Sequence, residues 1–215
     1  MVEPKFFEKI APYYDFLTRF FMMGTYGSVR ERMINEDTRQ FTVLDLCCGT
    51  GYISNTINAR KIVGLDQSER MLERNARVKR ENKILIKGNA YNIPFSEAEF
   101  DRIYCSTASH EFKKFSKVLD RCHQILKPDG KLILFDIYQP KNWLLSFIMN
   151  TFVRHAVERN LMWVYTKEQW LRLLAKAGFS IEELKIIRGF YIFIRAVKTL
   201  PDSSAPSQRK EGENL

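Results

Sequence analysis

The sequence predicts an α/β domain, in which strands and helices alternate along most of the 215 residues. Two stretches carry this prediction. Val43–Leu46 is an apolar run suited to a strand buried on both faces, and Gly49 and Gly51 follow it directly. A second strand over residues 61–65 ends at Asp66. A strand, a glycine turn, a helix and a second strand form a βαβ unit, the building block of a parallel sheet.

The glycine turn and Asp66 together indicate a nucleoside site. We expect a helix to begin at Tyr52, so that the turn presents backbone N–H groups to a ligand at a helix N-terminus. Asp66 lies 21 positions after Asp45. At the tip of the second strand, an acid suits the two hydroxyls of a ribose. Because Ser54 stands where a dinucleotide motif has its third glycine, the turn favours a smaller nucleoside, such as S-adenosylmethionine (SAM), over NAD.

The same motifs carry a family resemblance. V-L-D-L-C-C-G-T-G followed by G-L-D-Q-S-E-R-M-L resembles the first two motifs of the class I SAM-dependent methyltransferases. The N-terminal stretch F-E-K-I-A-P-Y-Y-D is similar to that of the ubiquinone and menaquinone biosynthesis methyltransferases. The resemblance implies a Rossmann-like fold: a seven-stranded, mostly parallel sheet, a C-terminal antiparallel hairpin and N-terminal helices as a lid. It also implies SAM as the cofactor, with no metal.

The resemblance further implies which residues bind the cofactor. Tyr14, the tyrosine of Y-D, is expected to help close over SAM. Asn89 stands where the family has an acid that contacts the adenine amino group, and its side-chain oxygen can accept from the same amine. A turn-capping role for Asn89 stays open. The expected cofactor-binding residues are Tyr14, Asp45, Cys47, Gly49, Gly51, Asp66, Gln67, Met71, Asn89, Ala90 and Ser106.

Apolar periodicity, turn residues and caps place the other elements. In chain order they are helices over 3–35, a helix capped by Ser68, a third strand over 82–88, a fourth over 99–106, a helix over 113–126, a turn over 126–131, a fifth strand over 132–136, a helix over 167–177 capped by Thr166, and hairpin strands over 179–187 and 190–198. We expect one domain over residues 1–198, with 1–38 as the helical lid and 140–165 as an insert over the acceptor. The polar tail 199–215 is expected to be disordered.

His110 is the candidate catalytic residue. It follows the fourth strand, and ligands of open α/β sheets bind beyond the carboxyl ends of the strands. An imidazole can take a proton near neutral pH, which would help if the acceptor were a phenol or a ring carbon. A polar cap on the following helix is the alternative role for His110.

The insert over residues 140–165 bears on the acceptor. It is rich in aromatic and aliphatic side chains, which indicates either an apolar, aromatic pocket or a helix at a membrane surface. Packing against the N-terminal helices is the competing interpretation. We therefore expect a small, lipophilic or aromatic acceptor resembling a quinone precursor, and we keep peripheral membrane contact as an expectation.

The net charge of +9 raises nucleic acid as a partner. The charges are spread out, however, and the fourth strand ends in C-S-T-A-S-H rather than the Asn/Asp-Pro-Pro-aromatic run of nucleic-acid amino-methyltransferases. Nucleic acid is therefore not expected, although an RNA methyltransferase and a non-catalytic subunit that binds a partner protein remain as alternatives. The four cysteines without C-x-x-C spacing and the lack of a signal peptide favour the cytoplasm.

Overall fold

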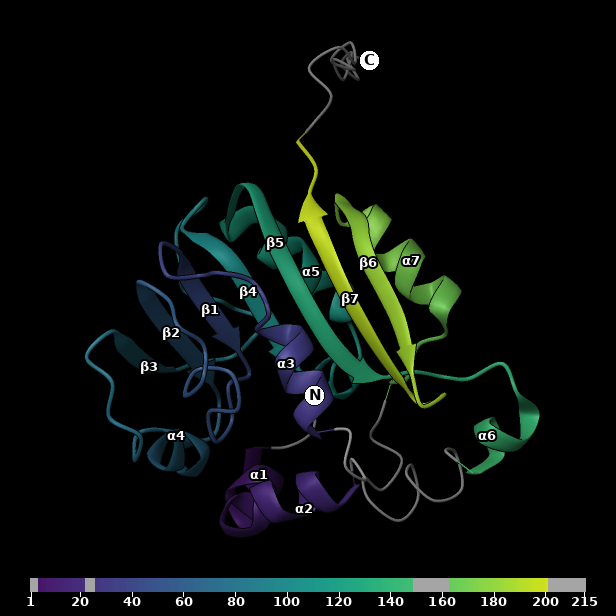
Figure 1. Cartoon of the computed structure of the whole chain (residues 1–215), viewed down its shortest axis with the longest axis horizontal. Helices are drawn as coiled ribbons and strands as arrows, with labels where there is room; N and C mark the ends of the chain where they lie inside the picture. Colours follow the sequence, from purple (N-terminus) through teal and green to yellow (C-terminus); the bar gives the residue numbers. More distant parts are fainter. Residues whose placement is uncertain (1–3, 22–25, 149–162, 201–215) are drawn as a thin grey trace, which may run out of the picture.

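A computed structural model describes residues 4–21, 26–148 and 163–200 of the chain (Figure 1). Seven strands form one sheet in the order β3-β2-β1-β4-β5-β7-β6. The strands β1 to β5 run parallel, and β7 is antiparallel to both of its neighbours, β5 and β6. The strands are β1 Thr42–Leu46, β2 Lys61–Asp66, β3 Lys83–Lys87, β4 Phe100–Ser106, β5 Leu126–Ile137, β6 Phe179–Ile187 and β7 Tyr191–Lys198. The predicted Rossmann-like fold with a seven-stranded, mostly parallel sheet is confirmed.

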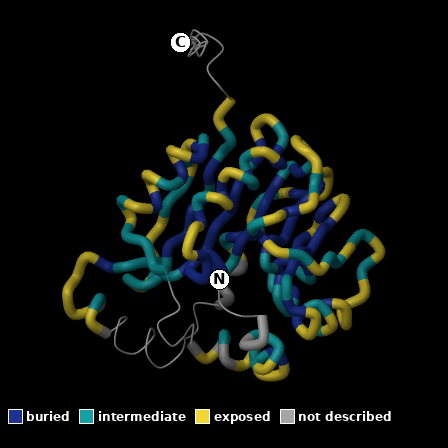
Figure 2. The backbone as a smooth tube through the Cα atoms, turned by 180° about the vertical axis from the view of Figure 1, so that it is seen from behind, coloured by how far each residue is buried: buried dark blue, intermediate teal, exposed yellow. Residues whose placement is uncertain are grey.

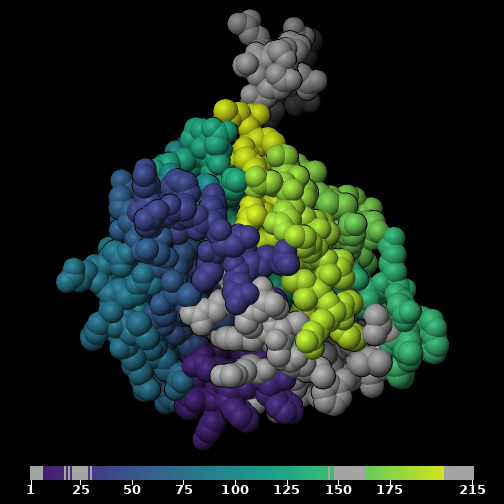
Figure 3. Space-filling view, viewed as in Figure 1, coloured from purple at the N-terminus to yellow at the C-terminus, as the bar shows by residue number. Residues whose placement is uncertain are grey.

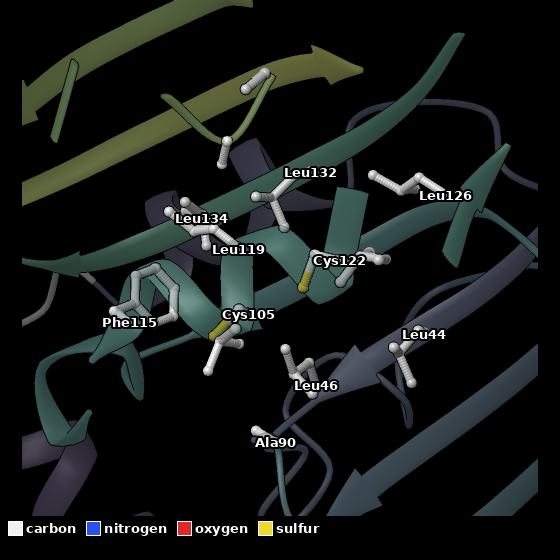
Figure 4. Close-up of a cluster of buried hydrophobic side chains, with 14 of the residues drawn as sticks. Leu44, Leu46, Ala90, Cys105, Phe115, Leu119, Cys122, Leu126, Leu132 and Leu134 are labelled. Carbon is white, nitrogen blue, oxygen red and sulfur yellow. The ribbon is translucent and has the colours of Figure 1, made fainter. Parts of the chain in front are cut away.

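Alternating side chains of the central strands divide the core into two layers. On one face, Leu44 and Leu46 pack with the apolar sides of α5 (Phe115–Ile125) and α7 (Lys167–Lys176), as Figure 4 shows for α5. On the other face, Val43 packs with residues of α3 (Tyr26–Met33). All five residues of β1 are buried, and Figure 2 shows the central strands as the buried part of the chain.

The N-terminal helices lie at the edge of the sheet where the parallel strands end. These are α1 (Pro4–Ile10), the 3₁₀ turn η1 (Ala11–Tyr13) and α2 (Tyr14–Phe21), at the bottom of Figures 1 and 3. The short helix α6 (Trp143–Ile148) follows β5 at the same edge. Most of the predicted insert and nearly all of the predicted disordered tail fall on residues 149–162 and 201–215, outside the described part of the chain.

The helix expected from Tyr52 does not form, and that prediction is wrong. Residues 51–56 are a series of turns, closed by bonds such as Asn55 N–H to the Gly51 carbonyl (3.0 Å). The carbonyls that a longer helix would use are taken by side chains instead. Arg80 donates to the carbonyls of Ser54 (3.1 Å) and Ile57 (2.7 Å). Hydrogen bonds from Arg80 thus stand in place of the helical backbone hydrogen bonds at these two carbonyls.

The fifth strand begins earlier than predicted. It is paired from Leu126, but the register then jumps, because Phe100 faces Leu126 while Arg102 faces Lys131. Residues 127–130, part of the predicted turn, therefore form an excursion within β5, in which Asp129 has a positive φ of 59°. The fifth strand is therefore present as predicted, but it runs from Leu126 to Ile137 rather than over 132–136.

Two predicted caps and the terminal hairpin are confirmed. The Ser68 side chain accepts from the N–H of Met71 (3.2 Å) at the start of α4 (Glu69–Asn75). Thr166 forms a capping box with Gln169 at the start of α7. The hairpin between β6 and β7 turns through the three residues 188–190, in which Arg188 and Gly189 have positive φ.

Candidate active site

A cleft opens at the carboxyl ends of β1, β2 and β4, where the sheet order reverses. Chain order runs outward from β1 to β3 on one side and from β4 onward on the other, so β1 and β4 flank the switch point at which α/β sheets bind ligands. The cleft has two adjoining hollows of about 490 and 440 Å³, including space open to solvent. Tyr14, Cys47, Gly49, Ser106 and Thr107 line both hollows.

The first hollow lies beside β2. Most of the predicted cofactor residues contribute to its wall, and the strand ends of β1, β2 and β4 bring them together although they come from different parts of the sequence. The predicted residues that line it are Tyr14, Cys47, Gly49, Asp66, Gln67, Met71, Ala90 and Ser106. It is also lined by Phe7, Leu65, Gly88, Thr107, Ala108, Glu111 and Phe112, none of which was predicted.

Asp66 links β2 to the glycine turn. One carboxylate oxygen accepts from the N–H of Gly49 (2.8 Å) and the other from the N–H of Ser68 (2.9 Å). Burial raises the pKa of Asp66, and these backbone donors oppose the rise. The expectation that Gly49 offers a bare N–H at a helix N-terminus is therefore wrong: its N–H is paired with Asp66, and no helix follows.

Gly51 has a structural role in the turn. Its N–H donates to the Cys48 carbonyl (2.9 Å), it has φ +96°, and it lines neither hollow. A Cβ at this position would stand 2.1 Å from Nδ2 of Asn55. The structure therefore places Gly51 behind the cleft wall, where only a glycine can be accommodated.

Asp45 lines the second hollow. Its carboxylate accepts from the N–H of Ser54 (2.8 Å), and this bond ties the turn after β1 to the strand itself. Burial raises the pKa of Asp45 to about 7, and the neighbouring Asp66 adds to the rise. In the same hollow, Thr50 donates to Asp15 of α2, which joins the turn to the N-terminal helices.

Tyr14 spans the two hollows. It begins α2 and is half-buried, with hydrogen bonds to the side chains of Thr107 and Thr18. Burial raises the pKa of Tyr14, and the negative charge of Glu111 raises it further. Tyr14 therefore stays a neutral phenol that can donate a hydrogen bond into the cleft.

Two residues at the strand ends adopt an uncommon backbone conformation. Cys47 follows β1 with φ 58°, and Thr107 follows β4 with φ 52°. Positive φ is rare for residues with a side chain and unusual for β-branched threonine, and such strain gathers at functional sites. Its occurrence at the two strands that flank the switch point supports this cleft as the working site.

Asn89 is not brought into the cleft wall. Its side chain is exposed, and its Oδ1 accepts from the N–H of Tyr91 (2.9 Å), which is the turn-capping geometry. Its neighbours Gly88 and Ala90 line the first hollow. A contact from Asn89 to adenine therefore stays a prediction without support from the lining.

His110 lies just outside the lining of the cleft. It occupies the 3₁₀ turn η2 (Ser109–Glu111) after β4, and its Nδ1 is hydrogen-bonded to Oδ1 of Asp136 on β5. Asp136 also accepts from the N–H groups of Ser109 (2.7 Å) and Ile137 (2.7 Å). Burial opposes ionisation of Asp136, but the charge and hydrogen bond of His110 lower its pKa. Sequence reasoning missed Asp136, since only the pairing of β4 with β5 brings it to His110.

The charge of the lining decides which cofactor suits the cleft. Asp45, Asp66 and Glu111 contribute carboxylates, and none of the described residues that line either hollow is Lys, Arg or His. This acidity stands in a chain of net charge +9. SAM carries a sulfonium and an ammonium group, whereas the phosphates of NAD would be repelled. The residues present therefore fit SAM.

Known proteins agree with this assignment. Residues 44–134 match the family described as "Methyltransferase domain". An uncharacterised methyltransferase of Synechocystis sp. is 32% identical over 155 residues, which cover 68% of this chain and 70% of that protein. The chain belongs to the class I SAM-dependent methyltransferases. SAM is accordingly its cofactor, and the protein is an enzyme.

This methyltransferase also resembles proteins with more specific names and proteins of known structure. A demethylmenaquinone methyltransferase of Thermotoga maritima is 29% identical over 201 residues, 82% of this chain and 87% of that protein. Among solved structures, a DhpI–SAH complex has a TM-score of 0.74 at 15% identity and covers 91% of this chain and 95% of that one. A SAM-dependent methyltransferase of Mesorhizobium loti has a TM-score of 0.68 at 17% identity, with 82% and 100% covered. These structures show a shared fold.

The described residues contain no group of three or more His, Cys, Asp or Glu residues placed to hold a metal ion. None of their helices combines the length and apolar character needed to cross a bilayer.

Proposed function

We propose that this methyltransferase acts on a small, lipophilic or aromatic acceptor resembling a quinone precursor. The observation that carries the proposal is the make-up of the first hollow, in which Phe7, Tyr14 and Phe112 stand beside the carboxylates. Aromatic walls suit a planar, apolar acceptor next to the cofactor. The demethylmenaquinone methyltransferases among its relatives, 25–29% identical, support the same class of acceptor.

In this proposal, different residues bind the cofactor and close the cleft. Asp66 and the turn it holds would bind the nucleoside, and Tyr14 would close the cleft from α2. When bound, SAM supplies an electrophilic methyl group on a sulfonium sulfur. The chain contributes mainly by holding the acceptor in line with that methyl and by excluding water, which can be worth about 7–11 kcal/mol.

His110 would act as the general base for an acceptor that must lose a proton. Ionised Asp136 accepts a hydrogen bond from Nδ1 of His110 and so keeps the proton on that nitrogen. Nε2 is then the basic nitrogen of the ring, oriented by its carboxylate partner. His110 directly precedes Glu111, which lines the cleft, and this neighbourhood supports the role.

We also infer that the edge of the molecule around the cleft docks on an anionic bilayer. Phe16 and Phe20 of α2 are 72% and 67% exposed and stack on each other, and Trp143 of α6 is 76% exposed. Exposed Lys113 and Lys114 follow η2 at the same edge. Exposed aromatic side chains, exposed lysines and a net charge of +9 complement a negatively charged lipid surface.

A methyl-transfer assay with isotope-labelled SAM tests the acceptor class. Incubation with a demethylated, short-chain naphthoquinol, with a catechol and with total RNA should give label in the quinol or the catechol and none in RNA. Label in RNA that falls with added salt would replace this proposal with the RNA alternative. Bound SAM without transfer to any acceptor would favour a non-catalytic subunit.

A further inference from the structure

Two acids of the N-terminal helices each follow an aromatic residue of the cleft wall. Phe7 precedes Glu8 in α1, and Tyr14 precedes Asp15 at the start of α2. Phe7 and Tyr14 line the first hollow, whereas the two acids are not among the described residues that line either hollow. The acids bond instead to the protein beside the cleft, and neither the cofactor nor the acceptor assignment uses them.

Glu8 joins α1 to the beginning of α4. Its Oε1 accepts from the hydroxyl of Ser68 (2.9 Å) and from the N–H of Glu69 (2.9 Å). Arg70 donates to the backbone carbonyl of Glu8 (3.2 Å) and pairs with its carboxylate (3.7 Å). The N–H of Ser68 donates to Asp66, so α1 is bonded to the segment that directly follows the carboxylate predicted to bind the ribose.

Asp15 joins α2 to two other segments beside the cleft. One carboxylate oxygen accepts from the hydroxyl of Thr50, which lies in the turn after β1 and lines the second hollow. The other oxygen accepts from Arg74 in the last turn of α4 (3.1 Å). The N-terminal helices are thus bonded to both ends of α4 by two acids, each one residue away from a side chain in the cleft.

We propose that Glu8 and Asp15 are positioning residues that latch α1 and α2 over bound SAM, so that these bonds must break before SAM can leave. The two helices have seven and eight residues, and helices this short are held in place by their contacts with the rest of a protein. The Glu8 and Asp15 side chains are 30% and 52% exposed, so water can replace their partners when the latches open. The latching role rests on the proposed closing of the cleft by Tyr14 and is independent of the acceptor.

Release of labelled SAM into an excess of unlabelled SAM measures the strength of the latches. Glu8→Ala and Asp15→Ala should each raise the rate of release about fivefold, and the double variant should raise it further. Glu8→Gln and Asp15→Asn keep an oxygen acceptor but lose the charge, so their rates should lie between those of the wild type and the alanine variants. The rate of association should not fall, because a loosened lid does not obstruct entry.

A reversal of charge tests whether Asp15 acts through Arg74. Asp15→Lys sets two cations side by side and should release SAM faster than Asp15→Ala does. Adding Arg74→Glu restores an ion pair of opposite sense and should slow release again at least about threefold, which general damage to α2 cannot produce. Glu73→Ala removes an exposed acid from α4 and is the matched control, whose release rate should stay within about twofold of wild type.

Tyr14→Ala separates the latches from the closing role of Tyr14. Faster release in Glu8→Ala and Asp15→Ala, with Tyr14→Ala like wild type, would contradict that closing role and support latches that act through Phe7. Faster release in Tyr14→Ala, with folded Glu8→Ala and Asp15→Ala proteins like wild type, overturns the latches. Slower association with unchanged release overturns them too, since the acids would then act only by attracting the cationic ligand.

Hydrogen exchange of the wild-type protein covers the case of variants that fail to fold. With SAM bound, the backbone amides of residues 7–18 should exchange at least about tenfold more slowly, because the ligand then opposes the opening of α1 and α2. Exchange that SAM leaves unchanged at these residues would show that the helices do not close over the cofactor, and it would overturn the proposal.

Discussion

His110 and Asp136 belong to neighbouring strand ends, and their pairing is the chemical feature that the sequence least revealed. Asp136 accepts from the ring of His110 and from four nearby backbone or hydroxyl groups, so its position is fixed. A carboxylate held in this way orients an imidazole and determines its tautomer. The pair can act as a unit, as a base and its positioning residue.

Replacement of His110 by Gln should therefore lower turnover about 10²–10⁴-fold, the usual contribution of a positioned base. Affinity for SAM should stay within about twofold, because the ring lies outside the cofactor lining. Asp136→Asn should lower turnover as well and shift the pH profile, since Asn holds the ring less firmly. His123→Gln on α5 is the matched control. Parallel loss of turnover and SAM binding in His110→Gln would assign it a structural role.

Asp45 makes stability depend on pH in the direction opposite to most carboxylates. Its pKa in the folded protein is about 7, against about 3.9 in an unfolded chain. Between these values the folded state binds more protons, so the free energy of unfolding falls as pH rises from about 4 to about 7. Well above pH 7 Asp45 is ionised in both states, so its contribution no longer changes with pH.

Urea unfolding of wild type and Asp45→Asn across pH 5 to 8 measures this contribution. Asn can still accept from the Ser54 N–H but cannot ionise. Relative to this variant, the wild type should lose about 2–3 kcal/mol between pH 5 and 8, at about 1.4 kcal/mol per pH unit. Stability curves that stay parallel would show that Asp45 is ionised throughout.

The turn after β1 is the element in which prediction and structure differ most. Both of its glycines have positive φ, but they differ in the space around them. A Cβ at Gly49 would meet nothing within 4 Å, whereas one at Gly51 would collide with Asn55 and Asn75. Gly51→Ala should therefore cost about 2–4 kcal/mol, and Gly49→Ala only about 1–2 kcal/mol. Urea midpoints at constant m-value give the two costs. Equal costs would mean that the turn relaxes around Gly51.

Strands, caps and the hairpin were easier to predict than that turn. Short apolar runs and capping residues act within a few positions of themselves, so β2, α4, α7 and the β6–β7 hairpin appear where their local signals lie. Residues 51–56 carry a helical pattern that competes with distant donors. Arg80 bonds the carbonyls of Ser54 and Ile57, and Asn82 bonds that of Ala59. These donors come from more than 20 residues further along the chain, so the local sequence does not predict them.

Across the whole molecule, charge is distributed unevenly. The protein has a net charge of +9, yet the described lining of the cleft is acidic. The helices α2 and α6, which carry exposed aromatic side chains, lie at the sheet edge that carries the cleft (Figure 1). An acceptor that partitions into lipid could then reach the site without crossing water.

Co-sedimentation with vesicles tests the docking face. Binding to vesicles that contain phosphatidylglycerol should exceed binding to pure phosphatidylcholine and weaken with salt. The double variant Phe16→Asp/Phe20→Asp should lose most of this binding, whereas Val78→Asp, exposed after α4, should keep it. Unchanged lipid binding in the double variant, or a change from dimer to monomer by light scattering, would assign the aromatic face to something other than a bilayer.

The sequence by itself determined the fold class and the cofactor, and it predicted Asp66 as the carboxylate for the ribose. These depend on hydrophobic period, glycine geometry and the fixed length of one βαβ unit, all of which are local along the chain. Tertiary structure decided the rest of the site. Asp66 meets Gly49 and Asp136 meets His110 only because parallel strands end at one edge, so that residues far apart in sequence become neighbours there.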